Sequence, residues 1–155
     1  TPVGCSHTFG NWVTATEASC KQNGEQYRTV NEVYDEKANS LSMELKEAYP
    51  PEAKVKSLVR SASLKDGRIE IKDRVEFDGN GEIDIHFVTH IKPEILDGRI
   101  ALAEGRSLIY DTKLTPEIEA FEVDKAFAGR WGSNELYRIH LKANTVAGEY
   151  VNYIK

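Results

Sequence analysis

The 155-residue chain has few cysteines and no long apolar run, and both absences restrict its architecture. Two cysteines, Cys5 and Cys20, are too few for a disulfide scaffold and lack the spacing of metal ligands. The sequence allows either one bridge between them or two free thiols. No segment approaches the roughly 20 apolar residues of a membrane-spanning helix, and the start lacks the basic and apolar regions of a secretory signal. We expect no membrane association, and the cellular compartment stays open.

Positive charge is also scarce. Twenty Lys and Arg residues against 25 Asp and Glu residues give a net charge of −5. Nucleic-acid-binding proteins gain affinity by neutralising phosphates, so this balance predicts no general nucleic-acid binder. Binding to an acidic polymer would need a local basic patch.

Length and composition predict a single folded domain over 1–155. Hydrophobic residues make up 40 % of the chain and charged residues 29 %, as in ordinary globular proteins. The chain does not begin with methionine. We therefore expect a processed product or a piece of a longer protein.

Common catalytic motifs are missing. The sequence contains no P-loop, no dinucleotide-binding fingerprint, no Gly-x-Ser-x-Gly elbow and no His-Glu-x-x-His pair. Gly79 and Gly81 are expected in a turn between two strands, which offers no helix N-terminus for an anion.

The dominant pattern is a two-residue alternation. Every even position in 68–77 is charged, and the odd positions are apolar except Asp73. This alternation is typical of a strand with one face in a core and one in water. Asp73 interrupts the inner face, and we expect there either a bulge or a carboxylate that accepts backbone N–H bonds.

The same alternation recurs about every dozen residues, with turn-forming residues in between. The chain is therefore predicted to be all-β, an antiparallel β-sandwich of two stacked sheets with about ten to twelve strands and little helix. Further strands are expected within 41–45, 82–87, 99–102 and 137–141, and hairpin-type turns at 65–67, 78–81 and 96–98.

The histidines offer limited scope for a metal site. His86 and His90 share one face of a predicted strand, but residues four apart lie roughly 13 Å apart, too far to bind one ion together without a bulge. One of them with carboxylates of neighbouring strands would suffice; the alternative is that both are plain surface residues. We interpret His140 as structural or incidental, and His7 as lying in a loop or an N-terminal edge.

Aromatic side chains next to polar ones suggest sugar binding. Trp131 follows Arg130 between two predicted strands, and rings stack on the apolar faces of sugars while polar groups read the hydroxyls. The alternative is that Trp131 covers the core. These patterns alone define an all-β domain without naming a function.

A resemblance to a known family rests on short matches in the correct order along nearly the whole chain. This succession resembles the β-sandwich domain that ends heparinase II/III-like polysaccharide lyases. The matching segments lie at 9–13, 22–27, 41–50, 59–64, 69–73, 87–89, 92–93, 131–132 and 136–139.

The resemblance implies a larger enzyme in which an N-terminal helical toroid precedes this domain and an acidic polysaccharide lies between them. The implied reaction is β-elimination, with a tyrosine from the toroid and a histidine from the start of the β region. The resemblance also implies one divalent metal, zinc, if the family site is retained. The implied residues are His7 and Asn11 for catalysis and Glu44, His86 and His90 for metal, while the aromatic and polar pattern predicts Trp12, Arg130 and Trp131 as substrate contacts.

The chain departs from the family where a catalytic histidine is usual. Asn11 follows Gly10 there, and an asparagine donates a hydrogen bond but carries no proton. No stretch of helical periodicity is long enough to supply the toroid. We therefore expect a lyase domain that is catalytically incomplete alone; the alternatives are a non-catalytic carbohydrate-binding domain and a structural interaction module.

Overall fold

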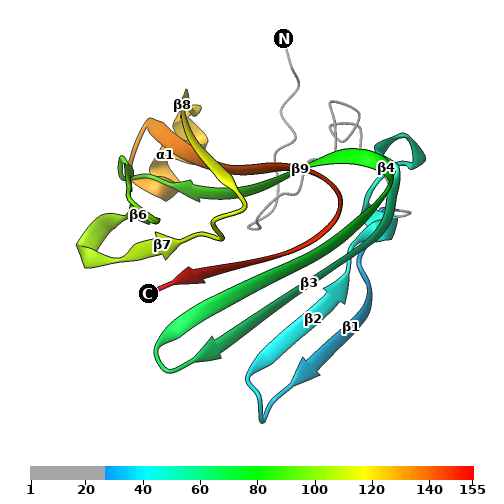
Figure 1. Cartoon of the computed structure of the whole chain (residues 1–155). Coiled ribbons are helices and arrows are strands. Elements are labelled where there is room, and N and C mark those ends of the chain that lie inside the picture. Colours follow the sequence, from blue (N-terminus) through cyan, green and yellow to red (C-terminus); the bar gives the residue numbers. More distant parts are fainter. Residues whose placement is uncertain (1–26) are drawn as a thin grey trace.

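A single antiparallel sheet dominates the computed structural model, which describes residues 27–155 (Figure 1). Its strand order is β1-β2-β3-β4-β9-β7-β6-β5, and β8 pairs with β9 beside this path. The strands are β1 (Val30–Asp35), β2 (Ser40–Glu44), β3 (Val55–Lys65), β4 (Arg68–Thr89), β5 (Glu94–Leu96), β6 (Arg99–Ala101), β7 (Ser107–Ile109), β8 (Thr115–Glu122) and β9 (Glu135–Ile154).

Within residues 27–155, helix is confined to short segments, as predicted. The one α-helix in the described part of the chain is α1 (Lys125–Trp131), which connects β8 to β9. The carboxylate of Asp124 caps it by accepting a hydrogen bond from the Phe127 amide, and Gly132 ends it in the left-handed conformation. The same described residues also contain the 3-10 turns η2 (Lys46–Ala48), η3 (Pro51–Ala53) and η4 (Ala103–Gly105).

Two predicted turns are confirmed. Asp66 and Gly67 have φ of 51° and 72° and close a two-residue hairpin between β3 and β4. Gly98, with φ of 70°, lies between β5 and β6. The residue types at these turns tolerate positive φ, which is why the sequence identified them.

The third predicted turn, at 78–81, is wrong. β4 continues through it for 22 residues, and its register with β9 shifts between Glu76 and Gly81. Figure 1 shows β4 and β9 bending together along their length. A Cβ on Gly81 would lie 2.5 Å from the Phe77 ring, so a glycine is needed for the ring to pack inside the bend.

One hydrophobic core lies against the folded sheet. It unites residues before the bend, such as Val75 and Phe77, with residues after it, such as Ile83 and Ile85. The prediction of an antiparallel, mostly β chain is confirmed. Among residues 27–155, however, nine strands form one continuous sheet, because the bend in β4 takes the place of the predicted hairpin.

Asp73 is neither at a bulge nor bound to backbone amides in the described structure. It lies in regular register opposite Arg60 and Tyr150, and its buried carboxylate accepts hydrogen bonds from the Arg60 side chain. The interruption of the apolar pattern thus marks a buried ion pair.

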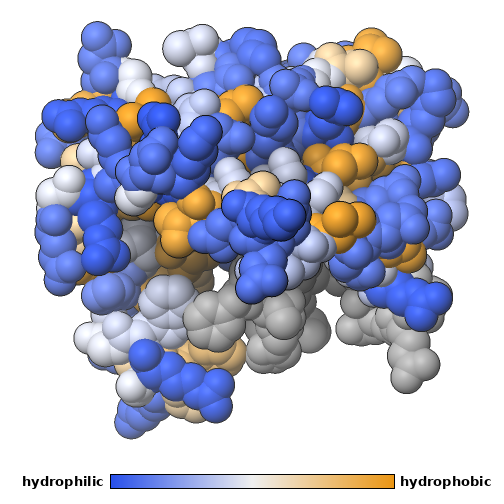
Figure 2. Space-filling model, turned by 90° about the horizontal axis from the view of Figure 1, so that it is seen from below, coloured by the Kyte–Doolittle hydropathy of each residue, from blue (hydrophilic) through white to orange (hydrophobic). Residues whose placement is uncertain are grey.

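The surface is mixed. Figure 2 shows a mostly hydrophilic face in which hydrophobic residues form separate patches. Within residues 27–155, no helix has the length and apolar character needed to cross a bilayer.

Candidate functional site

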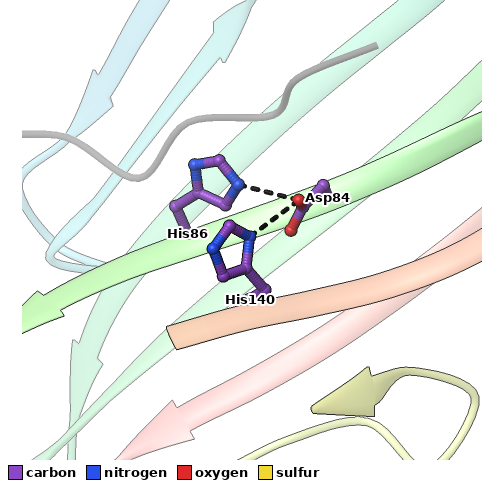
Figure 3. A group of neighbouring side chains, drawn as sticks. All are labelled: Asp84, His86 and His140. Carbon is purple, nitrogen blue, oxygen red and sulfur yellow. Dashed lines mark hydrogen bonds and ion pairs between the residues drawn. The ribbon is translucent and has the colours of Figure 1, made fainter. Parts of the chain in front are cut away.

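A carboxylate and two imidazoles come together on the polar face of the two longest strands (Figure 3). Asp84 and His86 are two residues apart on β4, so the pleat points both side chains to the same face. His140 on β9 is the register partner of His86. Strand pairing therefore gathers three residues from positions up to 56 apart in the sequence.

The two histidines meet at one oxygen. Oδ2 of Asp84 lies 2.9 Å from Nε2 of His86 and 2.9 Å from Nδ1 of His140. One potential ligand atom from each residue lies within 4.8 Å of the others. The two rings stand edge to face, with centroids 4.6 Å apart.

The cluster is largely withdrawn from solvent. Asp84 is 5 % exposed and His86 is 6 % exposed, whereas His140 is half-buried. Within the described part of the chain, Oδ1 of Asp84 and Nε2 of His86 are buried atoms that make no hydrogen bond. Nε2 of His86 nonetheless lies 2.9 Å from Oδ2 of Asp84, where an ion pair forms only if His86 is protonated. Buried polar atoms are rarely left without a hydrogen bond.

A second carboxylate lies behind His140. Glu119 on β8 places Oε2 3.3 Å from Nε2 of His140 and 3.0 Å from Nη1 of Arg138. On the same strand, Glu117 accepts a 2.7 Å hydrogen bond from Lys142. Charges of both signs therefore alternate across β8 and β9 around the cluster.

The surroundings hold the Asp84 carboxyl in its ionised form. Burial alone would raise its pKa, but the contacts with His140 and His86 outweigh burial and lower the pKa to about 2. The hydrogen bond with Asp84 in turn raises the pKa of His140, and burial only partly opposes this. Oδ2 of Asp84 is therefore an anionic oxygen that lies between nitrogens of His86 and His140.

Sequence reasoning found only part of this cluster. His86 was considered as a partner for carboxylates of neighbouring strands, although a surface position was the alternative, and it is buried. The sequence patterns do not single out Asp84, and from them we interpret His140 as structural or incidental. The signal available was the spacing of Asp84 and His86 on one strand face; the pairing with His140 depends on strand register, which the sequence does not display.

Glu44 and His90 lie outside this group of three in the described residues. Glu44 ends β2 and accepts a 2.8 Å hydrogen bond from the Asn31 side chain. His90 directly follows β4, with its ring centroid 6.5 Å from that of Trp131. Their metal-binding roles remain predictions.

The predicted substrate residues that the structure describes are in α1. Arg130 is exposed and Trp131 is partly buried, in the last turn of the helix. The predicted residues His7, Asn11 and Trp12 lie outside the described residues.

Solved structures with a similar fold exist, although sequence comparisons find no match. No family model and no curated protein matches this sequence. Among solved structures, a heparinase III gene product matches with a TM-score of 0.63 and 16 % identity, over 92 % of this chain. The heparan sulfate lyase HepC from Pedobacter heparinus matches with a TM-score of 0.55 and 12 % identity, over 82 % of this chain.

The chain spans about a fifth of these lyases, 22 % of the first and 21 % of the second. At these identities the likeness is one of fold. The chain therefore has the fold of one part of a heparinase III-type lyase, which confirms the resemblance inferred from the sequence.

Proposed function

We propose that this chain is the β-rich domain of a polysaccharide lyase that cleaves uronate-containing chains by β-elimination. The observation that carries the proposal is the match of 92 % of this chain to part of a heparinase III. In the complete protein, the folded sheet would act as the two layers of a sandwich and form one wall of the substrate cleft, with a helical toroid opposite.

The reaction sets requirements that a single β domain meets poorly. A base must remove the proton beside the uronate carboxylate while the bond to the 4-oxygen breaks, and donors or a cation must neutralise that carboxylate. Both ring nitrogens of His140 already face carboxylates, those of Asp84 and Glu119. These features favour a domain that does not complete the reaction alone.

The exposed end of α1 is the proposed sugar contact. The Arg130 guanidinium suits a uronate carboxylate, and the Trp131 indole suits the apolar face of a sugar ring. The roles implied for His7, Asn11 and Trp12 belong to the same proposal.

Incubation of the purified chain with heparan sulfate, chondroitin sulfate and alginate tests catalytic incompleteness. We expect no increase in the absorbance of unsaturated uronate, while a complete heparinase III run in parallel gives product from heparan sulfate. Robust product from this chain alone would overturn the claim. The coding sequence upstream of Thr1 tests the domain assignment, because we expect a long helical region there and its absence would contradict the assignment.

A non-catalytic carbohydrate-binding domain is the second candidate. The observation that favours it is the neighbouring Arg130 and Trp131 in α1, which need no catalytic partner to hold a sugar. Glycan-array binding that Trp131→Ala abolishes and Asn11→His leaves unchanged would support this function. Absence of binding to every glycan would reject it.

A further inference from the structure

We propose that Asp84, His86 and His140 bind one divalent transition-metal ion, preferentially Zn²⁺, that joins β4 to β9. This donor set differs from the one that the lyase resemblance suggested, which combined Glu44 with His86 or His90. The inference goes beyond the sugar chemistry and does not depend on it.

Donor atoms of all three side chains converge on one point. Two imidazole nitrogens from different strands lie 2.9 Å from the same carboxylate oxygen, and all three atoms fall within 4.8 Å. In a tetrahedral zinc site, bonds of about 2.0–2.1 Å place neighbouring ligand atoms about 3.3 Å apart. Small side-chain rotations would therefore bring these atoms to the spacing that one ion requires.

Two polar atoms of the cluster are buried without a hydrogen-bond partner in the described structure. Nε2 of His86 and Oδ1 of Asp84 belong to side chains that are more than nine-tenths buried, and neither atom makes a hydrogen bond in the described structure. A cluster held together only by hydrogen bonds would leave both buried atoms without a hydrogen-bond partner, which is unfavourable. A metal ion satisfies the nitrogen directly and draws the carboxylate toward it.

The chemistry of the donors selects the metal. Two neutral imidazoles and one carboxylate form a borderline N/O set, which suits Zn²⁺ and is too poor in oxygen for Ca²⁺ or Mg²⁺. Three protein ligands leave a fourth position for a water molecule or a second carboxylate oxygen. The position of the cluster between two long strands fits a stabilising ion.

Glu119 does not contact the proposed ion but lies next to His140 and orients its ring. Its carboxylate lies 3.3 Å from Nε2 of His140, so it favours the tautomer with the proton on Nε2. Nδ1, which faces Asp84, then keeps its lone pair for the metal. Carboxylates behind metal-binding histidines commonly orient the ring in this way. Glu119 is thus a positioning residue on a third strand, β8.

The test starts from the whole chain stripped of metal with a chelator. Isothermal titration calorimetry with ZnCl₂ and metal analysis after gel filtration should give one Zn²⁺ per chain, with CaCl₂ giving no binding. Added Zn²⁺ should raise the melting temperature by mass action. Co²⁺ should give the visible absorption of a tetrahedral ion. A chain that takes up no Zn²⁺ at micromolar concentration overturns the proposal.

Single substitutions test which side chains bind the Zn²⁺ ion. His86→Ala and Asp84→Asn should lose the bound Zn²⁺ and the Co²⁺ spectrum, with far-ultraviolet circular dichroism used to check that the sheet is intact. If the sheet is lost, Glu119→Gln decides, because Glu119 is half-exposed and its removal should weaken Zn²⁺ binding about 10–100-fold. Glu117→Gln on the same strand is the matched control and should bind as the wild type does.

His90→Ala separates the two donor sets. We expect full Zn²⁺ binding in this variant, because His90 is outside the cluster. Loss of Zn²⁺ in His90→Ala, or its retention in both His86→Ala and Asp84→Asn, would show that the ion binds elsewhere and would overturn the proposal.

Discussion

Arg60 and Asp73 face each other across β3 and β4 and form a two-pronged ion pair inside the sheet's apolar face. Nε and Nη2 of Arg60 lie 2.6 Å and 2.9 Å from the two oxygens of Asp73, whose side chain is fully buried. The planar guanidinium matches the carboxylate in this geometry. Because each charge compensates the other, both residues can occupy positions that alternation assigns to the core.

Breaking this pair should destabilise the protein strongly. We expect Asp73→Asn to lower the free energy of unfolding by about 3–5 kcal/mol, because the buried guanidinium loses its countercharge. The double variant Arg60→Met/Asp73→Leu should lose much less than the sum of the single changes. Urea denaturation of the wild type, Arg60→Met, Asp73→Leu and the double variant gives the coupling energy. A cost below about 1 kcal/mol for Asp73→Asn would contradict this account.

The bend of β4 depends on Gly81. A methyl group there would lie 2.5 Å from the Phe77 ring, so Gly81→Ala should cost about 1–3 kcal/mol. Gly129→Ala is the matched control, since it lies in α1 with open space around it and should be neutral or stabilising by up to about 1 kcal/mol. Thermal unfolding compares the two. Equal melting temperatures for both variants would show that the bend tolerates a side chain.

The start of α1 depends on the Asp124 cap. Its carboxylate accepts a 3.0 Å hydrogen bond from the Phe127 amide, so Asp124→Ala should destabilise the chain by about 1 kcal/mol. Asp124→Asn retains an acceptor and should stay close to the wild type. Chemical denaturation checks both, and similar losses in the two variants would mean that charge, rather than capping, matters at this position.

Local patterns predicted the strands well because alternation and turn chemistry act within a few residues. The Asp66-Gly67 hairpin and the strand around Ile71 followed from such patterns alone. The hairpin predicted around Gly79 was wrong because the glycines there allow a bend within one strand. The Phe77 ring packs against Gly81 in that bend. Nothing within four residues distinguishes that bend from a hairpin.

The candidate site was less predictable because it depends on register. Asp84 and His86 are neighbours on one strand face, but His140 joins them only through the pairing of β4 with β9. Likewise, Asp73 was recognised as an exception in an apolar row, whereas its partner Arg60 comes from another strand. Charged residues in or beside a core therefore call for a search across strands.

The pH dependence of the metal-free protein should reflect the contact of Asp84 with His140. The pKa of Asp84 falls from 3.8 to about 2 on folding, so its stabilising effect is complete above about pH 4 and is lost as the pH falls toward 2. The pKa of His140 is raised above 6.5, so its stabilising effect is complete below that pH and is lost as the pH rises through the raised value.

In chelator-treated protein, the Asp84–His140 pair should therefore contribute most to stability between about pH 4 and 6.5. Melting temperatures across the pH range, compared with those of Asp84→Asn, isolate its contribution from that of the other carboxylates. The variant should lose stability most within that window and least at either extreme, because the charge pair exists only between the two limits. A constant difference at every pH would mean that Asp84 stabilises the sheet by packing rather than through its charge.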